Sequence, residues 1–356
     1  MRPRSRYLWA AVTASTLLAS GLAGGLGVAS AAPRSSAGAV LPARVYAPYF
    51  EAYLSGSLAT VTKQSGARFA TLAFLQAAGK TGSAACTLTW NGDKNQPVSK
   101  GGYRSGIRYL RSVHGDAIVS FGGFSADNGG TEIADSCHSV PAIAADYEQL
   151  VRTYNLHRLD MDIEANSLTN TAGIDRRNRA IAMLESWARQ RGIPLWIQFT
   201  LGVEPTGFDQ TTLNILRNAV KNHTRVDSIN LMVFGYYLGK EKHALNMHVL
   251  AIKAANTVHS QLARVYPTVG SANLWHRLGF TMLPGIDDYP GKTEVTSSAD
   301  AQIIMKFARS KGMDFLSIWA LQRDNGGCPG TIDSNTCSGI AQTPWAFSHL
   351  LEPYTG

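Results

Sequence analysis

Short apolar runs alternate with helix-like stretches along most of the chain. Eight of these runs have the length of β-strands, and they are Arg44–Tyr49, Arg68–Leu75, Ala117–Gly122, His157–Glu164, Pro194–Leu201, Val226–Phe234, Leu278–Pro284 and Asp314–Ala320. Apolar residues at helical spacing follow most of the runs, and the clearest cases are Pro141–Tyr154, Ile174–Gln190, Asp209–Lys221, Lys242–Ala263, Ala299–Arg309 and Pro344–Leu351. Ser139 and Ser298 stand where helix N-caps are expected.

Eight strand–helix repeats are typical of the α/β class and predict a single (β/α)8 TIM barrel. An open, doubly wound sheet is the alternative. Closure is favoured because no glycine-rich nucleotide fingerprint follows the first strand. We expect the barrel to span residues 44–356 as one domain.

One of the eight runs carries acidic residues at alternate positions. Asp160, Asp162 and Glu164 are separated by Met161 and Ile163, so on a strand the acids share one face. Neighbouring acids there stand ~6–7 Å apart, repel one another and have pKa values that burial raises further.

The barrel decides where this acidic face points. An edge strand with one solvated face would show the same alternation, but helices cover every strand of a closed barrel on the outside. We therefore expect the acids to face the interior. Glu164 ends the fourth strand, at the end of the barrel where catalytic groups gather.

The N-terminus predicts a secretory signal peptide. Three arginines precede the apolar run Leu8–Val28, and Ala29–Ala31 gives a small-x-small cleavage pattern. An uncleaved anchor is the alternative, which the many Gly, Ala, Ser and Thr residues of the run disfavour. We expect a signal peptide over residues 1–31, a short disordered leader over residues 32–43, and a secreted, extracellular chain.

Charge and hydropathy exclude several classes of partner. Cleavage lowers the formal net charge from +8 to +5, because the signal peptide holds three arginines and no acid. That surplus, without a Lys/Arg-rich run, argues against nucleic-acid binding. No later segment reaches the ~18 apolar residues that span a bilayer. We expect a monomer with no membrane contact after cleavage.

The four cysteines are Cys86, Cys137, Cys328 and Cys337. An even number in an exported chain predicts two disulfides. We prefer Cys328–Cys337 as a loop clip with Cys86–Cys137 joining two earlier loops, although four cysteines allow three connectivities. A zinc site is the alternative, but neither a Cys-x-x-Cys motif nor a nearby His pair supports it.

With these motifs in order, the chain resembles glycoside hydrolase family 18, the chitinases, and within it the bacterial subgroup without an α+β insertion. Ser120–Gly123 matches the family's S-x-G-G, and Asp160–Glu164 matches its D-x-D-x-E core. Ile229–Tyr236 is similar to its methionine- and tyrosine-bearing sixth strand, and Ser317–Asp324 to an eighth strand that carries a floor tryptophan. The four motifs stand in barrel order and span nearly all of the mature chain.

The resemblance assigns roles to the acidic face. Family 18 is an exception to the two-carboxylate scheme, because the substrate's own N-acetyl oxygen attacks the anomeric carbon. Glu164 would then be the general acid and later the base. Asp162 would hold the acetamido N–H, and Asp160 would share a proton with Asp162.

The resemblance also implies residues that contact the sugar. These are Trp319, Tyr49, Met232, Tyr236, Gly122 and Gly123. Trp319 would be the floor beneath the sugar, since polar residues after it mark a strand mouth; a core role is the alternative for Trp319 and for Tyr49. The two glycines would allow close backbone approach, or else only a tight turn.

The chain departs from the family pattern at two places. His157 and Arg158 stand where the family often has Asp-Gly, a change that we discount. Gly235 stands where relatives carry an Asp that helps hold the acetamido group, and Tyr236 or Tyr237 would have to supply a replacement donor. After the seventh strand, the pair Asp287–Asp288 either lines the cleft or caps a turn.

The resemblance implies a retaining chitinase that cleaves β-1,4 linkages in chitin or N-acetylglucosamine oligosaccharides. The segment between Pro284 and Ala299 is too short for the extra α+β subdomain of some relatives, so we expect an open groove and endo cleavage. An endo-β-N-acetylglucosaminidase acting on N-glycans and a weakly active or non-catalytic chitin-binding protein are the alternatives. Neither a metal nor an organic cofactor is implied.

Overall fold

The computed structural model describes residues 42–54, 56–238, 245–288, 293–332 and 334–356. The expected signal peptide and the leader up to residue 41 lie outside the described residues. One compact unit contains everything that is described. Within it, no helix is both long enough and apolar enough to cross a membrane.

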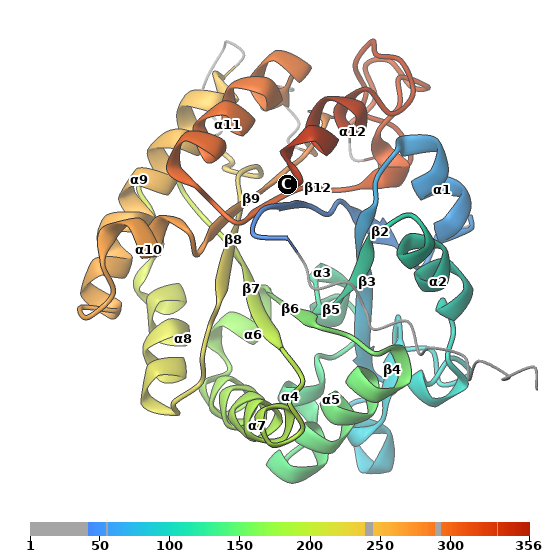
Figure 1. Ribbon diagram of the computed structural model, residues 1–356, viewed down its shortest axis with the longest axis vertical. Helices are drawn as coiled ribbons and strands as arrows, with labels where there is room; N and C mark the ends of the chain where they lie inside the picture. Colours follow the sequence, from blue (N-terminus) through green and yellow to red (C-terminus); the bar gives the residue numbers. More distant parts are fainter. Residues whose placement is uncertain (1–41, 55, 239–244, 289–292, 333) are drawn as a thin grey trace, which may run out of the picture. The chain divides into compact units, whose positions relative to one another are not determined.

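Eight parallel strand positions close into a ring (Figure 1). They are β1 with β2 (Val45–Tyr46 and Tyr49–Glu51), β3 (Phe69–Ala77), β5 (Asp116–Gly122), β6 (Arg158–Ile163), β7 (Trp196–Gly202), β8 (Ser228–Met232), β9 (Leu278–Met282) and β12 (Phe315–Ile318). The first strand is split because Pro48 has no N–H for the ladder. Its first half pairs with β12 and its second half with β3, so the ring is closed. The predicted barrel is confirmed, and the open sheet is excluded.

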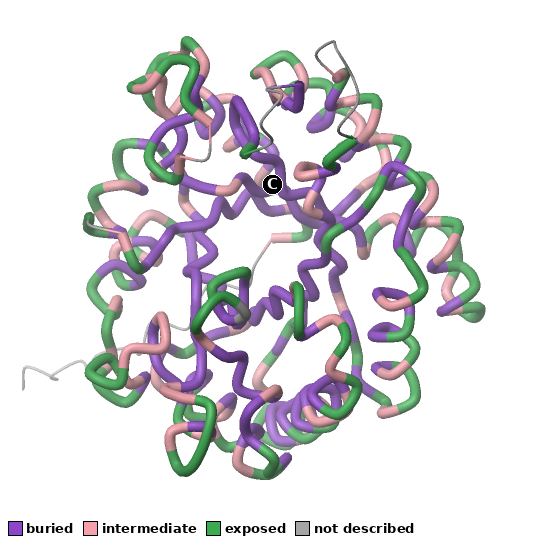
Figure 2. The backbone as a smooth tube through the Cα atoms, turned by 180° about the vertical axis from the view of Figure 1, so that it is seen from behind, coloured by how far each residue is buried: buried purple, intermediate pink, exposed green. Residues whose placement is uncertain are grey.

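Helices surround the ring in Figure 1. The bounds are α1 Leu58–Ser65, α2 Arg104–Ser112, α3 Phe124–Asp127, α4 Ile133–Ser136, α5 Val140–Tyr154, α6 Ala165–Thr169, α7 Thr171–Gln190, α8 Gln210–Lys221, α9 Met247–Val265, α10 Ser271–Trp275, α11 Ser298–Lys311 and α12 Ala346–Leu351. Residues 242–244 of one expected helix lie outside the described residues, and that helix, α9, begins at Met247. The purple, buried parts of Figure 2 run along the strands and the inner faces of the helices.

The two expected N-caps have different outcomes. The Ser139 side chain accepts a hydrogen bond from the Ala142 N–H and caps α5, as predicted. Ser298 is wrong by one residue, because Ser297 caps α11. Asp300 completes a capping box with Ser297, and this reciprocal pair sets where the helix begins.

Short elements decorate the ring. Strand β4 (Leu88–Trp90) pairs with β3, and β10 (Gly285–Ile286) pairs with β11 (Val295–Thr296). The disulfides Cys86–Cys137 and Cys328–Cys337 are both present, which confirms the preferred connectivity.

The two ends of the barrel chain meet beside the first strand. The Tyr46 N–H donates to the Thr355 hydroxyl at 2.9 Å, and the Gly356 N–H donates to the Arg44 carbonyl at 3.2 Å. Arg44 precedes β1, so both ends lie at the N-terminal end of the strands, opposite the end that Glu164 follows.

Candidate active site

Strand β6 directs its acidic residues into the barrel. Leu159, Met161 and Ile163 belong to the hydrophobic core outside the sheet and are at most 1% exposed. Asp160 and Asp162 point the other way and are also buried. The strand is buried on both faces, because the helices cover one side and the ring encloses the other.

Asp160 accepts four hydrogen bonds in the middle of the barrel. Its Oδ2 accepts from Tyr49 Oη at 2.8 Å and from Ser120 Oγ at 2.7 Å. Its Oδ1 accepts from Gln198 Nε2 at 2.9 Å and from Thr200 Oγ1 at 2.7 Å. The register brings these partners together, because Asp160 pairs with Ser120 on β5 and with Gln198 on β7.

The surroundings raise the pKa values of the two aspartates to different extents. Burial raises the pKa of Asp160, while the donated hydrogen bonds from Thr200, Ser120, Tyr49 and Gln198 oppose that rise. Burial raises the pKa of Asp162 well above its usual range, and the nearby charges of Glu164 and Asp160 raise it further. Asp162 is therefore the more basic member of the pair, and a proton that the two aspartates share is held preferentially by Asp162.

Glu164 follows β6 at the mouth of the ring. It occupies the residue before α6 and is half-buried. Together with Asp162 it lines a cleft whose cavity volume is about 770 Å³. Asp162 and Glu164, to which the resemblance assigns direct roles in the reaction, therefore both border the cleft.

Aromatic rings form one wall of this cleft. Trp319, directly after β12, is half-buried and lines the cleft with Tyr49 and Phe74. Its ring stacks on Phe74 with 5.4 Å between centroids and 16° between planes, and it lies 5.4 Å from the Tyr49 ring. Glu164 and the Trp319 indole thus border one cavity.

The predicted sugar-contacting residues are distributed unevenly. Trp319, Tyr49 and Met232 line the cleft. Tyr236 does not line it: the residue is only 3% exposed, and its N–H donates to Glu294 Oε2 at 2.8 Å. Tyr237 lines the cleft instead and is 58% exposed, because the chain turns at Gly235 and presents the later tyrosine.

Gly122 and Gly123 lie beneath the cleft rather than along its wall. Both have positive φ, +88° and +73°. A Cβ on Gly122 would stand 2.3 Å from the Asp162 carbonyl oxygen, and one on Gly123 would stand 2.4 Å from the Phe74 ring. The close approach that these glycines allow is therefore to the site's own strand and aromatic wall.

Gly122→Ala is expected to lower the free energy of unfolding by at least about 1–2 kcal/mol, since the residue needs a left-handed backbone and the added Cβ meets the β6 backbone. Urea unfolding measures the change. Gly102→Ala is the matched control, because a Cβ there meets Trp90 at an ordinary 3.9 Å and the φ is not in the left-handed region. Equal stabilities of the two variants would contradict this account.

Gly235 marks the departure from the family pattern, and Asp287, directly after β10, reaches it. The Gly235 N–H donates to Asp287 Oδ2 at 2.8 Å. Asp287 lines the cleft, and burial raises the pKa of Asp287 to about 7. The Asp288 carboxyl group adds to the rise, whereas the N–H groups of Asp288 and Gly235 oppose it. The pair Asp287–Asp288 had two predicted roles, lining the cleft or capping a turn. Both residues line the cleft.

Sequence reasoning missed several residues of the site. Ser120 was noted only within its motif, while Gln198, Thr200 and Phe74 were not singled out at all. On β7, Gln198 and Thr200 alternate with buried apolar residues, as the acids of β6 do. This alternation is the sequence signal that marks them. Phe74 lies within an unbroken apolar run, where nothing separates it from core.

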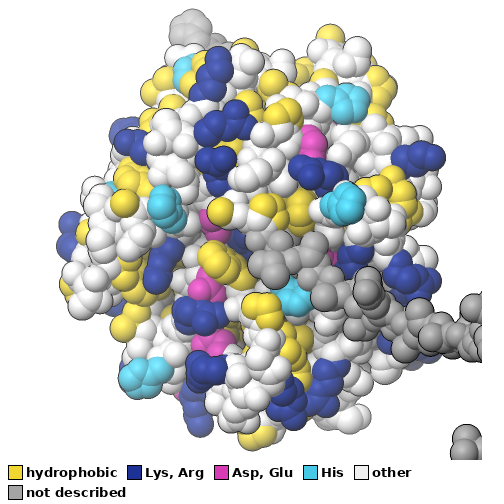
Figure 3. All heavy atoms as spheres, viewed as in Figure 1, with side chains coloured by type: hydrophobic (Ala, Val, Ile, Leu, Met, Phe, Trp, Pro, Cys, Tyr) yellow, Lys and Arg dark blue, Asp and Glu magenta, His cyan; other side chains and the backbone are white. Residues whose placement is uncertain are grey.

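The surface seen in Figure 3 carries Lys and Arg side chains scattered among hydrophobic and acidic ones, with no single basic patch on the described part of that face.

Two curated proteins are similar to this chain. A protein named "Probable bifunctional chitinase/lysozyme" from Escherichia coli (strain K12) is 31% identical over 324 residues, which is 88% of this chain and 35% of that protein. "Endochitinase 11" from Metarhizium anisopliae is 29% identical over 290 residues, which is 80% of this chain and 53% of that protein. The chain thus spans about a third to a half of the length of these relatives. No family model matches the chain.

Solved structures show the same relationship. The catalytic domain of the hyperthermophilic chitinase from Pyrococcus furiosus has a TM-score of 0.76 and 27% identity, with 89% of this chain and 97% of that chain covered. The GH18 chitinase ChiB of Flavobacterium johnsoniae has a TM-score of 0.54 at 15% identity over 88% of this chain and 94% of that chain, and shows the fold alone. The resemblance predicted from the sequence is therefore confirmed: the chain is a homologue of the glycoside hydrolase family 18 chitinases in sequence and in fold.

Proposed function

We propose that the chain is a chitinase that hydrolyses β-1,4 linkages between N-acetylglucosamine units with retention. The observation that carries the proposal is that Asp162 and Glu164 border the same cleft as the Trp319 ring. The names of the relatives support the substrate, and one similar structure, of catalytic-site mutants of the Pyrococcus furiosus enzyme, is a complex with chito-oligosaccharides.

In the proposed mechanism the sugar at the scissile bond lies on the indole of Trp319. Glu164 donates its proton to the glycosidic oxygen as the bond from that oxygen to C1 breaks. The acetamido oxygen of the same sugar attacks C1 and forms an oxazolinium ion. Asp162 accepts the acetamido N–H and stabilises the positive charge that develops there.

The second half of the reaction restores the enzyme. The Glu164 carboxylate takes a proton from water, whose oxygen attacks C1 from the face that the leaving group vacated. The oxazolinium ring opens and the acetamido group re-forms. Two inversions at C1 give net retention. Each step uses only side chains of this chain and the substrate's own acetamido group.

We also propose that cleavage is endo. Between β9 and α11 the described residues form only the small β10–β11 pair, and this supports a groove without an added subdomain. The Metarhizium anisopliae relative is named an endochitinase, which points the same way. Release of disaccharide alone from a chain end at early times would contradict endo cleavage.

The test is product analysis of N-acetylglucosamine oligomers by wild type and by Glu164→Gln. Retention predicts that the β-anomer appears first, which proton NMR of the fresh products detects. A glycoprotein substrate is digested in parallel: release of N-glycans without cleavage of the oligomers would replace the proposal with an endo-β-N-acetylglucosaminidase. Binding of oligomers that survives Glu164→Gln, with no turnover by wild type, would indicate a binding protein.

We propose that the chain is exported. Two disulfides support an oxidising environment. N-terminal sequencing of protein recovered from the medium is expected to begin at Ala32, directly after the predicted signal peptide.

Trp319→Ala is expected to raise KM by about tenfold, which corresponds to about 1.4 kcal/mol of lost stacking on the sugar. Trp319→Phe keeps an aromatic face and should recover most of the affinity. Initial rates on a soluble oligomer separate KM from kcat. An unchanged KM in Trp319→Ala would remove the indole from the proposed sugar site.

A further inference from the structure

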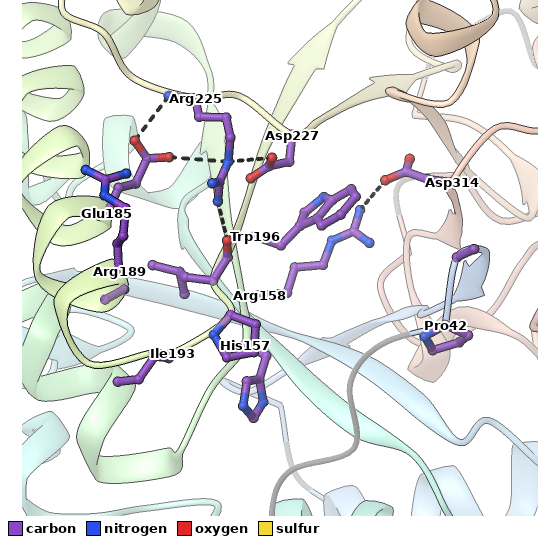
Figure 4. A pocket seen from close by; sticks show the side chains of 15 residues that line it. Pro42, His157, Arg158, Glu185, Arg189, Ile193, Trp196, Arg225, Asp227 and Asp314 are labelled. Carbon is purple, nitrogen blue, oxygen red and sulfur yellow. Dashed lines mark hydrogen bonds and ion pairs between the residues drawn. The ribbon is translucent and has the colours of Figure 1, made fainter.

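Arg158 lies at the other end of the strand that carries the acids. It begins β6 two positions before Asp160, so its side chain also enters the barrel, and it is only 2% exposed. Figure 4 shows its guanidinium beside the Trp196 ring and directed to Asp314. The distances are 5.7 Å to the Trp196 centroid and 3.1 Å from Nη2 to Asp314 Oδ2.

This end of the barrel has its own cavity, remote from the cleft. A pocket of about 620 Å³ is lined by Arg158, Trp196 and Asp314, and it shares no residue with the cleft at Glu164. Arg158 therefore cannot reach a sugar bound beside Trp319. Any effect of Arg158 on the reaction must pass through the interior of the barrel.

One side chain connects Arg158 to the acids. Arg158 Nη2 donates to Gln198 Oε1 at 2.5 Å, and Gln198 Nε2 donates to Asp160 Oδ1 at 2.9 Å. A guanidinium can only donate, so it binds the oxygen end of the amide and leaves the NH2 end directed toward Asp160. The three hydroxyls on Asp160 can rotate to donate or accept, whereas the amide held by Arg158 can only donate.

We propose that Arg158 is a positioning residue of this site: by fixing Gln198 as a donor, it keeps Asp160 the ionised member of the aspartate pair and leaves the shared proton on Asp162. The inference rests on the proposed function for its effect on rate. The proposal assigns a role to Arg158, which stands where the family often has glycine.

Of the hydrogen bonds that Asp160 accepts, the one from Gln198 comes from a group that Arg158 holds as a donor. Among the described residues, Tyr49 from β2, Asp162 above and the Arg158–Asp314 pair below are the ionisable groups that face Asp160, with Glu164 beyond Asp162. The contacts from β5 and β7 come from neutral Ser120, Thr200 and Gln198. Burial raises the pKa of Asp162 well above its usual range, which agrees with a proton held there.

Arg158→Met is expected to move the acid limb of kcat/KM upward by about one pH unit. Without the guanidinium the amide is free to turn its oxygen toward Asp160, which then binds a proton more readily. The pair therefore takes up its second proton at a higher pH. With a proton on each aspartate, Asp162 cannot pass its own proton to Asp160 and so cannot offer a carboxylate to the acetamido N–H. KM on the plateau should stay at the wild-type value, because Arg158 lies far from the cleft.

Three variants separate positioning from a merely structural role. Arg158→Lys keeps a cationic donor and should restore the wild-type acid limb. Gln198→Met should reproduce the shift, and adding Arg158→Met to it should add little, because the two residues act in series. Ser228→Ala removes the 2.9 Å hydrogen bond from Ser228 to Asp314 and leaves Gln198 untouched, so its pH profile should be that of wild type.

A readout without turnover keeps the inference distinct from the proposed function. Aspartate labelled with 13C at the carboxyl carbon reports the titration of Asp160 by NMR, with Asp160→Asn for assignment. Arg158→Met and Gln198→Met should both raise the pKa of Asp160 in this measurement, whatever the substrate. An unchanged titration and acid limb in both variants overturns the inference, whereas a wild type that cleaves no oligomer overturns only the proposed function.

Discussion

Glu164→Gln is expected to lower kcat by about 10²–10⁴-fold, the usual contribution of a general acid. The amide has the shape of the carboxyl group but cannot give up a proton to the glycosidic oxygen. Glu164 is half-buried at the mouth of the ring, and glutamine fills the same space. Initial rates on a soluble N-acetylglucosamine oligomer measure the loss.

Binding and folding provide the controls for this variant. The Trp319 wall is intact in Glu164→Gln, so calorimetry should detect oligomer binding close to that of wild type. Glu148→Gln makes the same chemical change on α5, where the acid pairs with Arg152, and should leave kcat unchanged. A Glu164→Gln variant that retains more than about a tenth of wild-type kcat would remove Glu164 from the acid role.

Asp162→Asn is expected to lower kcat by about 10²–10³-fold, which is typical when a preorganised electrostatic group is lost. Asparagine keeps the size of the side chain but cannot carry the negative charge that faces the oxazolinium ion. It also removes the proton that the aspartate pair shares. The acid limb of kcat/KM should then reflect Asp160 alone.

A buried acid elsewhere gives the matched comparison. Burial raises the pKa of Asp146 on α5 to about 6, and this residue lies on neither the cleft nor β6. Asp146→Asn therefore tests whether neutralising any buried aspartate slows the enzyme, and no rate change is expected. If both variants lost activity equally, the loss would reflect general damage rather than chemistry at the cleft.

The fold was predictable because its signals are local and repeated. All eight strand positions overlap the apolar runs, although β2, β3, β5 and β7 extend one or two residues beyond them. A parallel strand covered by helices is mostly apolar, which makes such runs visible. The boundaries were less certain: the predicted cap at Ser298 failed because Ser and Asp recur within a few positions, and only the reciprocal hydrogen bonds select Ser297. The split at Pro48 depends on which neighbour each half of the strand joins, which no local pattern contains.

The site was predictable only where one strand carries it. The alternation of acidic and apolar residues identifies Asp160, Asp162 and Glu164 in the sequence, but their partners come from other strands. Gln198 and Thr200 meet Asp160 through the register of β6 against β7, and Asp287 reaches Gly235 across the β8–β9 side of the ring. The choice of Tyr237 over Tyr236 for the cleft follows from the turn at Gly235, a backbone conformation that residue types do not fix.

The junction of the barrel's two ends bears on how the chain folds. The bond from Tyr46 to Thr355 joins residues 309 positions apart, and β1 pairs with β12 over a similar separation. These contacts cannot form until β12 and Thr355 have left the ribosome, and closing loops of this length costs conformational entropy. The ring therefore stays open while β12 and the residues after it are still being made: β2 can already pair with β3, but β1 has no strand to join.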